Sequence, residues 1–108
     1  MPNMIRVRCQ RNDGKIINLE VKGHANSDIY GKDLVCAAVS AILFGGLNAL
    51  ENPKAFEIHS NEKSGELTLN VIGDVSTHDY DVLDVILTQL KTVEESNKDY
   101  VQIVEKGQ

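Results

Sequence analysis

The chain has 108 residues, 42% apolar and 25% charged, a balance typical of a soluble globular protein and a length that predicts one domain, residues 1–108. Its net charge of -5, with 11 Lys and Arg scattered among 16 Asp and Glu, argues against a dedicated nucleic-acid-binding protein, so we expect no direct nucleic-acid partner. No apolar run approaches the roughly 18 residues of a membrane span, and the N-terminus lacks the apolar region of a signal peptide, so we expect a cytoplasmic protein without a membrane partner.

The first predicted elements are two strands joined by a tight turn. Apolar and polar residues alternate over residues 4–11, which predicts a half-buried strand. Its inward residues are Ile5, Val7 and Cys9. Asp13-Gly14 is a strong hairpin signal, and a second strand follows it and ends at Gly23. The inward residues of this second strand are expected to be Ile17, Leu19 and Val21.

A helix is predicted after a polar segment, residues 26–32, that has no periodicity and indicates a loop. Asp33 is the expected N-cap of this helix, which covers residues 34–50 and carries an apolar stripe. Pro53 disfavours helical geometry before it, so the helix should end near Asn52. Gly45-Gly46 predicts close packing against the sheet or another helix, because each glycine costs a helix about 1 kcal/mol.

The second half of the chain repeats the plan of the first. Residues 55–60 and 67–71 alternate as two further strands, and Ser76 with Asp79 resembles a capping box that starts a second helix. Tyr100–Val104 predicts a short closing strand. The order ββαββα with a final β predicts a two-layer α+β fold, in which an antiparallel or mixed sheet of four to five strands carries two helices on one face.

Two cysteines, without a CxxC motif or a ligand cluster, predict reduced thiols and no metal site. Cys9 lies on the apolar face of the first strand, where burial is a sufficient explanation. Cys36 would be the third residue of a helix capped by Asp33, where backbone N–H groups without acceptors and the helix dipole favour a thiolate. The alternative for Cys36 is a core cysteine on an amphipathic helix.

Three histidines are candidates for a general base. His59, on the outward face of the third strand, and His78, in the first turn of the second helix, are expected to be exposed. His24 follows Gly23 at a strand end, twelve residues before Cys36, and cysteine with histidine is the usual nucleophile–base pair. Strict alternation would instead place His24 on the polar face of the strand, so a surface histidine is the alternative.

The motif G-H-A at residues 23–25, followed by G-x-D-x-V-C-A-A-V-S at residues 31–40, resembles the ribosomal-processing cysteine protease (Prp) family. In length and element order the resemblance covers nearly the whole chain. It implies a cysteine endopeptidase, without a cofactor, that removes the N-terminal extension from the precursor of large-subunit ribosomal protein twenty-seven during ribosome maturation. It also implies a homodimer and a mobile segment between the catalytic histidine and cysteine.

The resemblance assigns His24 as the base and Cys36 as the nucleophile of a Cys–His dyad that acts through an acyl-enzyme. The other motif matches, expected to support the site or bind substrate, are Gly23, Gly31, Asp33 and Ser40. Asp33 either caps the helix or orients His24, and Ser40 either bonds back to the helix or forms a polar wall of the site. Residues 26–32 are either a lid over the substrate or a plain connecting loop.

The sequence leaves two other functions open. One is a non-catalytic, ribosome-associated protein-binding module with the same fold, which would not need both His24 and Cys36. The other is a redox-sensing thiol protein built on Cys36, whose function would respond to oxidation but not to His24→Ala.

Overall fold

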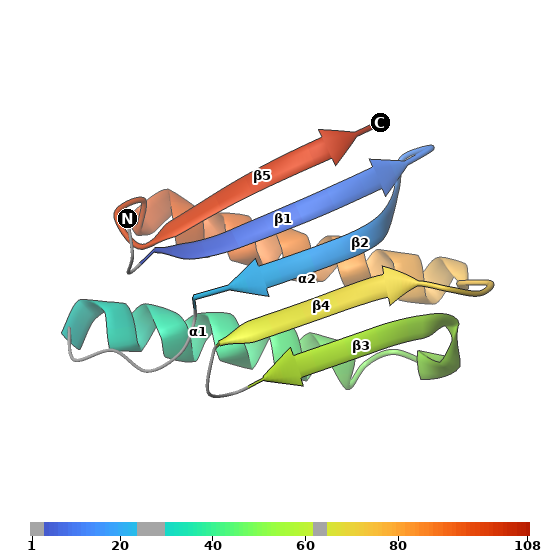
Figure 1. Ribbon diagram of the computed structural model, residues 1–108, viewed down its shortest axis with the longest axis horizontal. Helices are drawn as coiled ribbons and strands as arrows, with labels where there is room; N and C mark the ends of the chain where they lie inside the picture. The colour runs from blue at the N-terminus through green and yellow to red at the C-terminus, as the bar shows by residue number, and fades with distance from the viewer. Residues whose placement is uncertain (1–3, 24–29, 62–64) are drawn as a thin grey trace.

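The computed structural model describes residues 4–23, 30–61 and 65–108, with the backbone alone for residues 30–33. Figure 1 shows a sheet lying over two helices. In chain order the elements are β1 (Ile5–Asn12), β2 (Lys15–Lys22), α1 (Tyr30–Leu47), a 3₁₀ turn η1 (Pro53–Ala55), β3 (Phe56–Asn61), β4 (Glu66–Val71), α2 (Thr77–Ser96) and β5 (Val101–Gly107). This order confirms the predicted ββαββα plan with a final strand.

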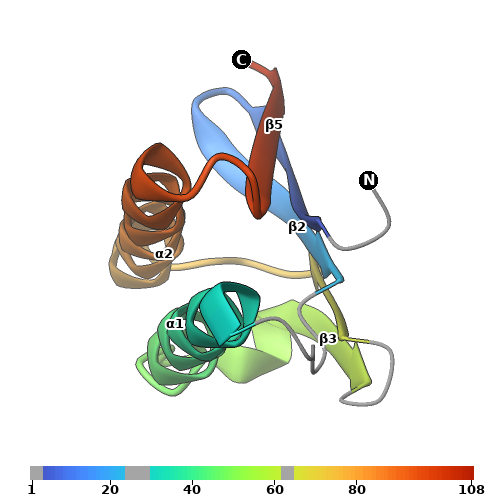
Figure 2. The same ribbon diagram turned by 90° about the vertical axis from the view of Figure 1, so that its left-hand side faces the viewer.

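The strands form one mixed sheet in the order β3-β4-β2-β1-β5. Neighbouring strands are antiparallel except β1 and β5, which run parallel. A parallel partner requires a crossover connection, and α2 supplies it between β4 and β5. Seen from the end of the molecule, both helices cover the same face of the sheet (Figure 2). The two-layer α+β architecture is therefore as predicted.

The hydrophobic core lies between the sheet and the helices. β1 contributes Ile5, Val7 and Cys9, each at most 2% exposed, as the alternation predicted. The fully buried apolar residues of α2 are Leu83, Ile86, Leu87 and Leu90. Removing such side chains from water is worth about 1.5–3 kcal/mol each, so this layer holds both helices in place.

The β1–β2 hairpin turns at Asp13 and Gly14, whose φ angles of 54° and 77° are those of the two-residue turn that Asp-Gly favours. The prediction that Ile17 faces the core is wrong. The pairing shifts from Gln10↔Asn18 to Arg11↔Ile16, which leaves Ile17 as the extra residue of a β-bulge. Ile16 is consequently 1% exposed, while Ile17 is only half-buried.

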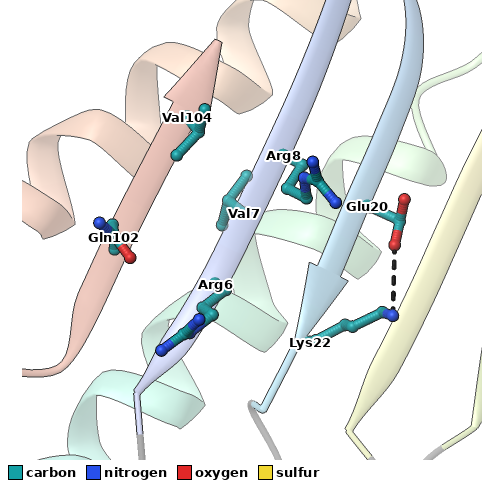
Figure 3. Close-up of a pocket in the computed structure, with 7 residues that line it drawn as sticks. All are labelled: Arg6, Val7, Arg8, Glu20, Lys22, Gln102 and Val104. Carbon is teal, nitrogen blue, oxygen red and sulfur yellow. Dashed lines mark ion pairs between the residues drawn. The ribbon is translucent and has the colours of Figure 1, made fainter. Parts of the chain in front are cut away.

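On the other face of the sheet, no helix from the described part of the chain covers the strands, and polar and charged side chains project from it. Arg6 and Arg8 of β1 and Lys22 of β2 project from this face beside Gln102 of β5 (Figure 3). We refer to this side as the open face of the sheet.

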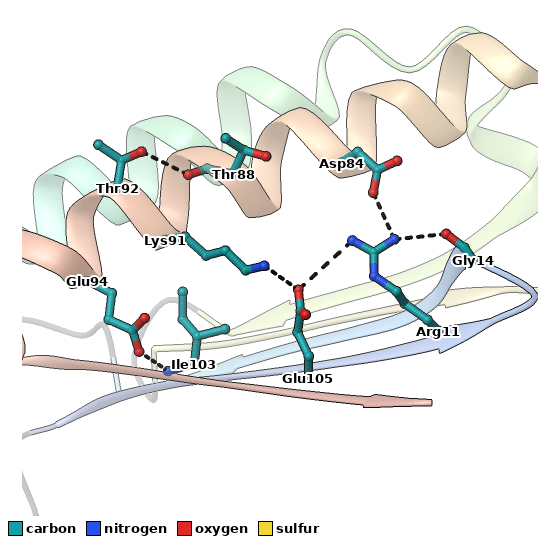
Figure 4. Close-up of polar contacts among 9 residues, drawn as sticks. All are labelled: Arg11, Gly14, Asp84, Thr88, Lys91, Thr92, Glu94, Ile103 and Glu105. Atoms are coloured by element: carbon teal, nitrogen blue, oxygen red, sulfur yellow. Dashed lines mark hydrogen bonds and ion pairs between the residues drawn. The ribbon is translucent and has the colours of Figure 1, made fainter. Parts of the chain in front are cut away.

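The closing strand β5 is longer than predicted and is tied to α2 by charged side chains (Figure 4). Arg11, which points to the helix side after the bulge, places Nη1 3.0 Å from Asp84 Oδ1. Lys91 Nζ lies 2.6 Å from Glu105 Oε1. The carboxylate of Glu94 accepts a 2.7 Å hydrogen bond from the backbone N–H of Ile103, which occupies a donor of this edge strand.

The first helix differs from its predicted bounds at both ends. It begins at Tyr30 rather than after Asp33, and it ends at Leu47 rather than near Asn52. At the C-terminal end the N–H groups of Ala49 and Leu50 donate to the carbonyls of Gly46 and Leu47 at 2.9 and 3.2 Å, a tighter turn than an α-helix makes. Gly45 and Gly46 lower the helix propensity just before this point.

Gly46 also explains the predicted close packing. A Cβ atom at this position would overlap the side chain of Ile86 on α2, whereas a Cβ on Gly45 would meet nothing within 4 Å. The glycine pair therefore has one packing position, facing the second helix, and one open position.

Candidate active site

Cys36 lies on the side of α1 that faces the core and is 7% exposed. Because the helix begins at Tyr30, Cys36 is its seventh residue, and the prediction that it is the third is wrong. Backbone N–H groups without helical acceptors belong to the first four residues of a helix, here residues 30–33. The helix dipole acts mainly within that turn, so its direct effect on the Cys36 thiol is smaller than the sequence suggested.

Asp33 is inside the first turn of α1 and is therefore not the N-cap that the sequence predicted. No proline lies between Tyr30 and Asp33, so the helix can extend back over these residues. Gly31 occupies the second helical position. Ser40 follows Cys36 by one turn on the same side of the helix and is half-buried, which places its hydroxyl beside the thiol-bearing face.

Gly23 directly follows β2 and has a backbone conformation that only glycine adopts easily. Its φ angle is +87°, and a Cβ atom here would lie 2.6 Å from the carbonyl oxygen of Met4. This left-handed turn comes directly after the last residue of β2. Figures 1 and 2 show that the end of β2 and the start of α1 lie at the same end of the molecule. His24, Ala25 and residues 26–29 of the predicted lid lie outside the described residues.

Cys9 is not suited to act as a nucleophile. It is 2% exposed in the centre of the core and forms no disulfide with Cys36. Burial raises the pKa of the Cys9 thiol, although the positive charge of Arg11 acts in the other direction. Since the thiolate is the reactive form, Cys9 is a structural residue, as predicted.

The other two histidines are exposed, as the sequence predicted. His59 on β3 is 70% exposed and pairs with Glu57, with 3.2 Å between Nε2 and Oε1. His78 at the start of α2 is 48% exposed and places Nδ1 2.9 Å from Asp79 Oδ1. The hydrogen bond to Asp79 raises the pKa of His78, and the nearby Glu51 carboxylate adds to that effect.

Asp79 joins two segments of the chain, in addition to its part in the N-terminal cap of α2. Ser76 Oγ accepts a 3.1 Å hydrogen bond from the Asp79 N–H, which confirms the N-cap. The Asp79 carboxylate is fully buried and accepts bonds of 2.8 and 3.0 Å from the N–H groups of Glu51 and Asn52. It therefore fastens the segment after α1 to the first turn of α2, which the local sequence around Ser76 does not reveal.

The balance of forces on Asp79 favours its charged form. Burial raises the pKa of the carboxyl, but the hydrogen bonds that it accepts from the Glu51 N–H, the His78 ring and the Asn52 N–H outweigh burial and hold its pKa below the ordinary value.

One ligand atom each from Glu51, His78 and Asp79 lies within 4.8 Å of the others, a spacing that a metal ion could span. The N–H groups already use both Asp79 oxygens, so we interpret the cluster as a structural clasp.

Comparisons with known proteins agree with the motif at residues 23–40. The family model described as cysteine protease Prp matches residues 4–102. The chain is 31% identical over 106 residues, 93% of its length and 97% of the relative's, to the ribosomal processing cysteine protease Prp of Staphylococcus aureus. It is 34% identical over 104 residues to the protein of that name from Mycoplasma genitalium, covering 96% of this chain and 98% of the relative.

Comparison with solved structures supports the same family. The crystal structure of the essential ribosomal processing protease Prp from S. aureus, in complex with a covalently linked product peptide, superposes with a TM-score of 0.82. The sequence identity is 30%, and the match covers 95% of this chain and all of the other. Within the described residues, none of the helices is both long and apolar enough to cross a membrane. This chain is therefore a cysteine peptidase that belongs to the ribosomal-processing cysteine protease (Prp) family.

Proposed function

We propose that this chain removes the N-terminal extension from the precursor of large-subunit ribosomal protein twenty-seven during ribosome maturation, with Cys36 as nucleophile and His24 as general base. The observation that carries the proposal is the relation of Gly23 to α1. Gly23 turns the chain out of β2 at the end of the molecule where α1 begins, and Cys36 follows in the second turn of that helix. The names of the relatives, which describe ribosomal processing, support the substrate class.

The proposed reaction has two steps, the formation of an acyl-enzyme and its hydrolysis. His24 takes the proton of the Cys36 thiol, and the thiolate attacks the scissile carbonyl carbon. The tetrahedral intermediate collapses, the amine leaves with the proton from His24, and an acyl-enzyme remains on Cys36. A water molecule, deprotonated by His24, then hydrolyses the thioester and releases the acid product. N–H groups in the first turn of α1 are the proposed donors to the oxyanion.

Supporting roles follow from position on α1 and β2. Asp33, one turn before Cys36, is proposed to orient the ring of His24 through its carboxylate. Ser40, one turn after Cys36, is proposed as a polar wall of the substrate site. Gly23 and Gly31 are proposed to shape the backbone on either side of residues 24–30.

We also propose that the chain works in the cytoplasm as a homodimer, and one surface of α1 supports the second point. Between Leu34 and Leu50 the sequence has no charged residue. Leu34 and Phe44 are nevertheless 56% and 40% exposed, on a stripe that also includes Ala37 and Ala41. A helix that is apolar on every side is normally covered on every side, so this stripe is the proposed contact with a second copy.

The test is cleavage of a synthetic peptide that spans the precursor junction. The wild-type chain should cut it, Cys36→Ala should not, and His24→Ala should lower kcat by roughly 10²–10⁴-fold, the usual effect of losing a general base. Cys9→Ala is the matched control and should cut at the wild-type rate, because Cys9 is a core residue.

Each failure of this test points to a different function. Cleavage that survives in Cys36→Ala would refute the nucleophile. Binding of the peptide without cleavage by the wild type would instead favour the non-catalytic binding module.

A further inference from the structure

The open face of the sheet holds a group of cations that the proposed peptidase does not use. In the register of the sheet, Arg6 lies directly opposite Lys22 on β2 and beside Gln102 on β5. Arg8 is the next outward residue of β1, about 6.8 Å further along the strand. Like charges directly opposite each other destabilise a strand pair, so this arrangement costs the fold free energy.

Glu20 is the acidic residue that lines this part of the face and partly offsets its positive charge. It lies directly opposite Arg8 in the register of β1 and β2, but its ion pair is with Lys22, with 3.5 Å between Oε1 and Nζ (Figure 3). Among residues 4–23, 30–61 and 65–108, neither Arg6 nor Arg8 takes part in an ion pair or a side-chain hydrogen bond. The two guanidinium groups therefore present their full set of donors to solvent.

The cations line two hollows on the open face of the sheet. A cavity of about 300 Å³ is lined by Arg6, Arg8, Lys22, Glu20, Gln102 and Val104, with Val7 at its floor. A second hollow of about 290 Å³ continues from Arg8 along the sheet to Gln10 and Lys106. The four cations therefore border one continuous track across β2, β1 and β5, on the side of the sheet away from Cys36 and α1.

We propose that this track binds the phosphate backbone of RNA. Guanidinium groups bind phosphate oxygens through paired hydrogen bonds, and phosphate contacts supply most sequence-independent affinity for nucleic acids. The described residues of the lining include no aromatic side chain on which bases could stack, so the binding would not depend on base sequence. The choice of RNA over an acidic protein rests on the proposed function, because a ribosomal protein precursor is assembled with RNA.

The net charge alone predicted no nucleic-acid partner. The chain is acidic overall, with a net charge of -5, but four of its cations line the hollows of the open face. Because the track and Cys36 lie on opposite sides of the sheet, RNA and a substrate peptide can occupy the protein together. The enzyme would then be held on a ribosomal particle while its catalytic side remains accessible.

The experiment measures fluorescence anisotropy of a labelled oligouridylate and of a labelled RNA hairpin, each titrated with the Cys36→Ala protein. We expect a slope of log K against log salt of about -3, which corresponds to four phosphate contacts on a single strand. Arg6→Gln with Arg8→Gln should reduce that slope to about -1.5 and lower the affinity roughly tenfold at low salt. Lys54→Gln with Lys98→Gln is the control, since it removes the same charge from exposed positions elsewhere, and it should leave the affinity unchanged.

The outcomes separate this inference from the proposed function. Equal RNA affinity for the two double variants, or no binding of either RNA, would overturn it. So would tighter binding to polyglutamate than to RNA, which would identify an acidic protein as the partner. Cleavage of the free precursor peptide by Arg6→Gln/Arg8→Gln should proceed at the wild-type rate, whereas a failed peptidase would show no cleavage in any variant.

Discussion

The two thiols of this chain differ in what their positions allow them to do. Cys9 is enclosed by the core between the sheet and α2, and burial raises its pKa. Cys36 is also shielded, at 7% exposed, but it lies near the end of the molecule where Gly23 turns the chain out of β2. The two thiols therefore differ in position rather than in the exposure of the resting side chain.

Selective alkylation tests this difference. In iodoacetamide near neutral pH, Cys36 should react at least roughly tenfold faster than Cys9, because the reagent attacks thiolates. The rates are measured by mass spectrometry on Cys9→Ala and Cys36→Ala, each of which keeps one thiol. Both variants should react at the same rate once unfolded, and equally slow reaction of the folded proteins would count against an activated Cys36.

The clasp at Asp79 predicts how stability depends on pH. The folded pKa of His78 is raised, so its contribution is complete below the unfolded value of about 6.5 and is lost as the pH rises through the folded pKa. The folded pKa of Asp79 is lowered, so its contribution is present above the unfolded value of about 3.9 and is lost as the pH falls through the folded pKa. The pair is therefore most stabilising between these limits, near pH 5.

Urea unfolding of the wild type and His78→Gln at several pH values measures this effect. The difference in free energy of unfolding should be largest near pH 5 and should shrink as the pH rises through the folded pKa of His78, because the imidazole then loses its charge. His59→Gln is the control, because the His59–Glu57 pair is exposed on an edge strand. A difference that stays constant from pH 5 to pH 9 would show that the charge of His78 has no part in the clasp.

At the scale of elements, the fold was predictable because hydrophobic periodicity decides which side of a strand or helix is buried. Where the prediction failed, a non-local or competing effect was responsible. The bulge at Ile17 depends on how β2 pairs with β1, which a single-strand pattern does not contain. The start of α1 was placed too late because Asp33 is a good N-cap in isolation, although it is also tolerated in the first turn.

Hydrophobic periodicity predicted less of the candidate site than of the fold. Gly23, His24 and Cys36 emerged from the motif and its family resemblance, since no periodicity argument distinguishes a reactive thiol from a buried one. The clasp of Asp79 to Glu51 and Asn52 joins residues 27 and 28 positions apart, so no local pattern could indicate it.

The glycine pair in α1 gives an element-scale prediction with its own control. Gly46→Ala should destabilise the protein by about 1–3 kcal/mol, because its Cβ would overlap the buried Ile86 side chain at the contact between α1 and α2. Gly45→Ala, which would meet nothing within 4 Å, should instead stabilise it by up to about 1 kcal/mol through helix propensity. Chemical denaturation of both variants measures the two values, and a shift of the same sign in both would exclude the packing role of Gly46.

Considered as a whole, the molecule has two unlike surfaces on opposite sides of its core. The open face of the sheet carries Arg6, Arg8 and Lys22 and suits a polyanion. The outer side of α1 carries exposed apolar residues without any charge, and suits a dry protein contact. Because the two surfaces belong to different layers, each can be altered without disturbing the other.

The apolar stripe on α1 leads to the prediction at this largest scale. Leu34→Glu with Phe44→Glu should convert a dimer into a monomer, since two carboxylates per chain would have to be buried in the contact without partners. Val85→Glu is the matched control, because Val85 is an equally exposed apolar residue, at 57%, on the other helix. Light scattering coupled to size-exclusion chromatography reports the mass of each protein, and circular dichroism confirms that the variants are folded. A monomeric wild type, or dissociation by Val85→Glu to the same extent, would remove α1 as the contact and leave its exposed stripe to the peptide substrate.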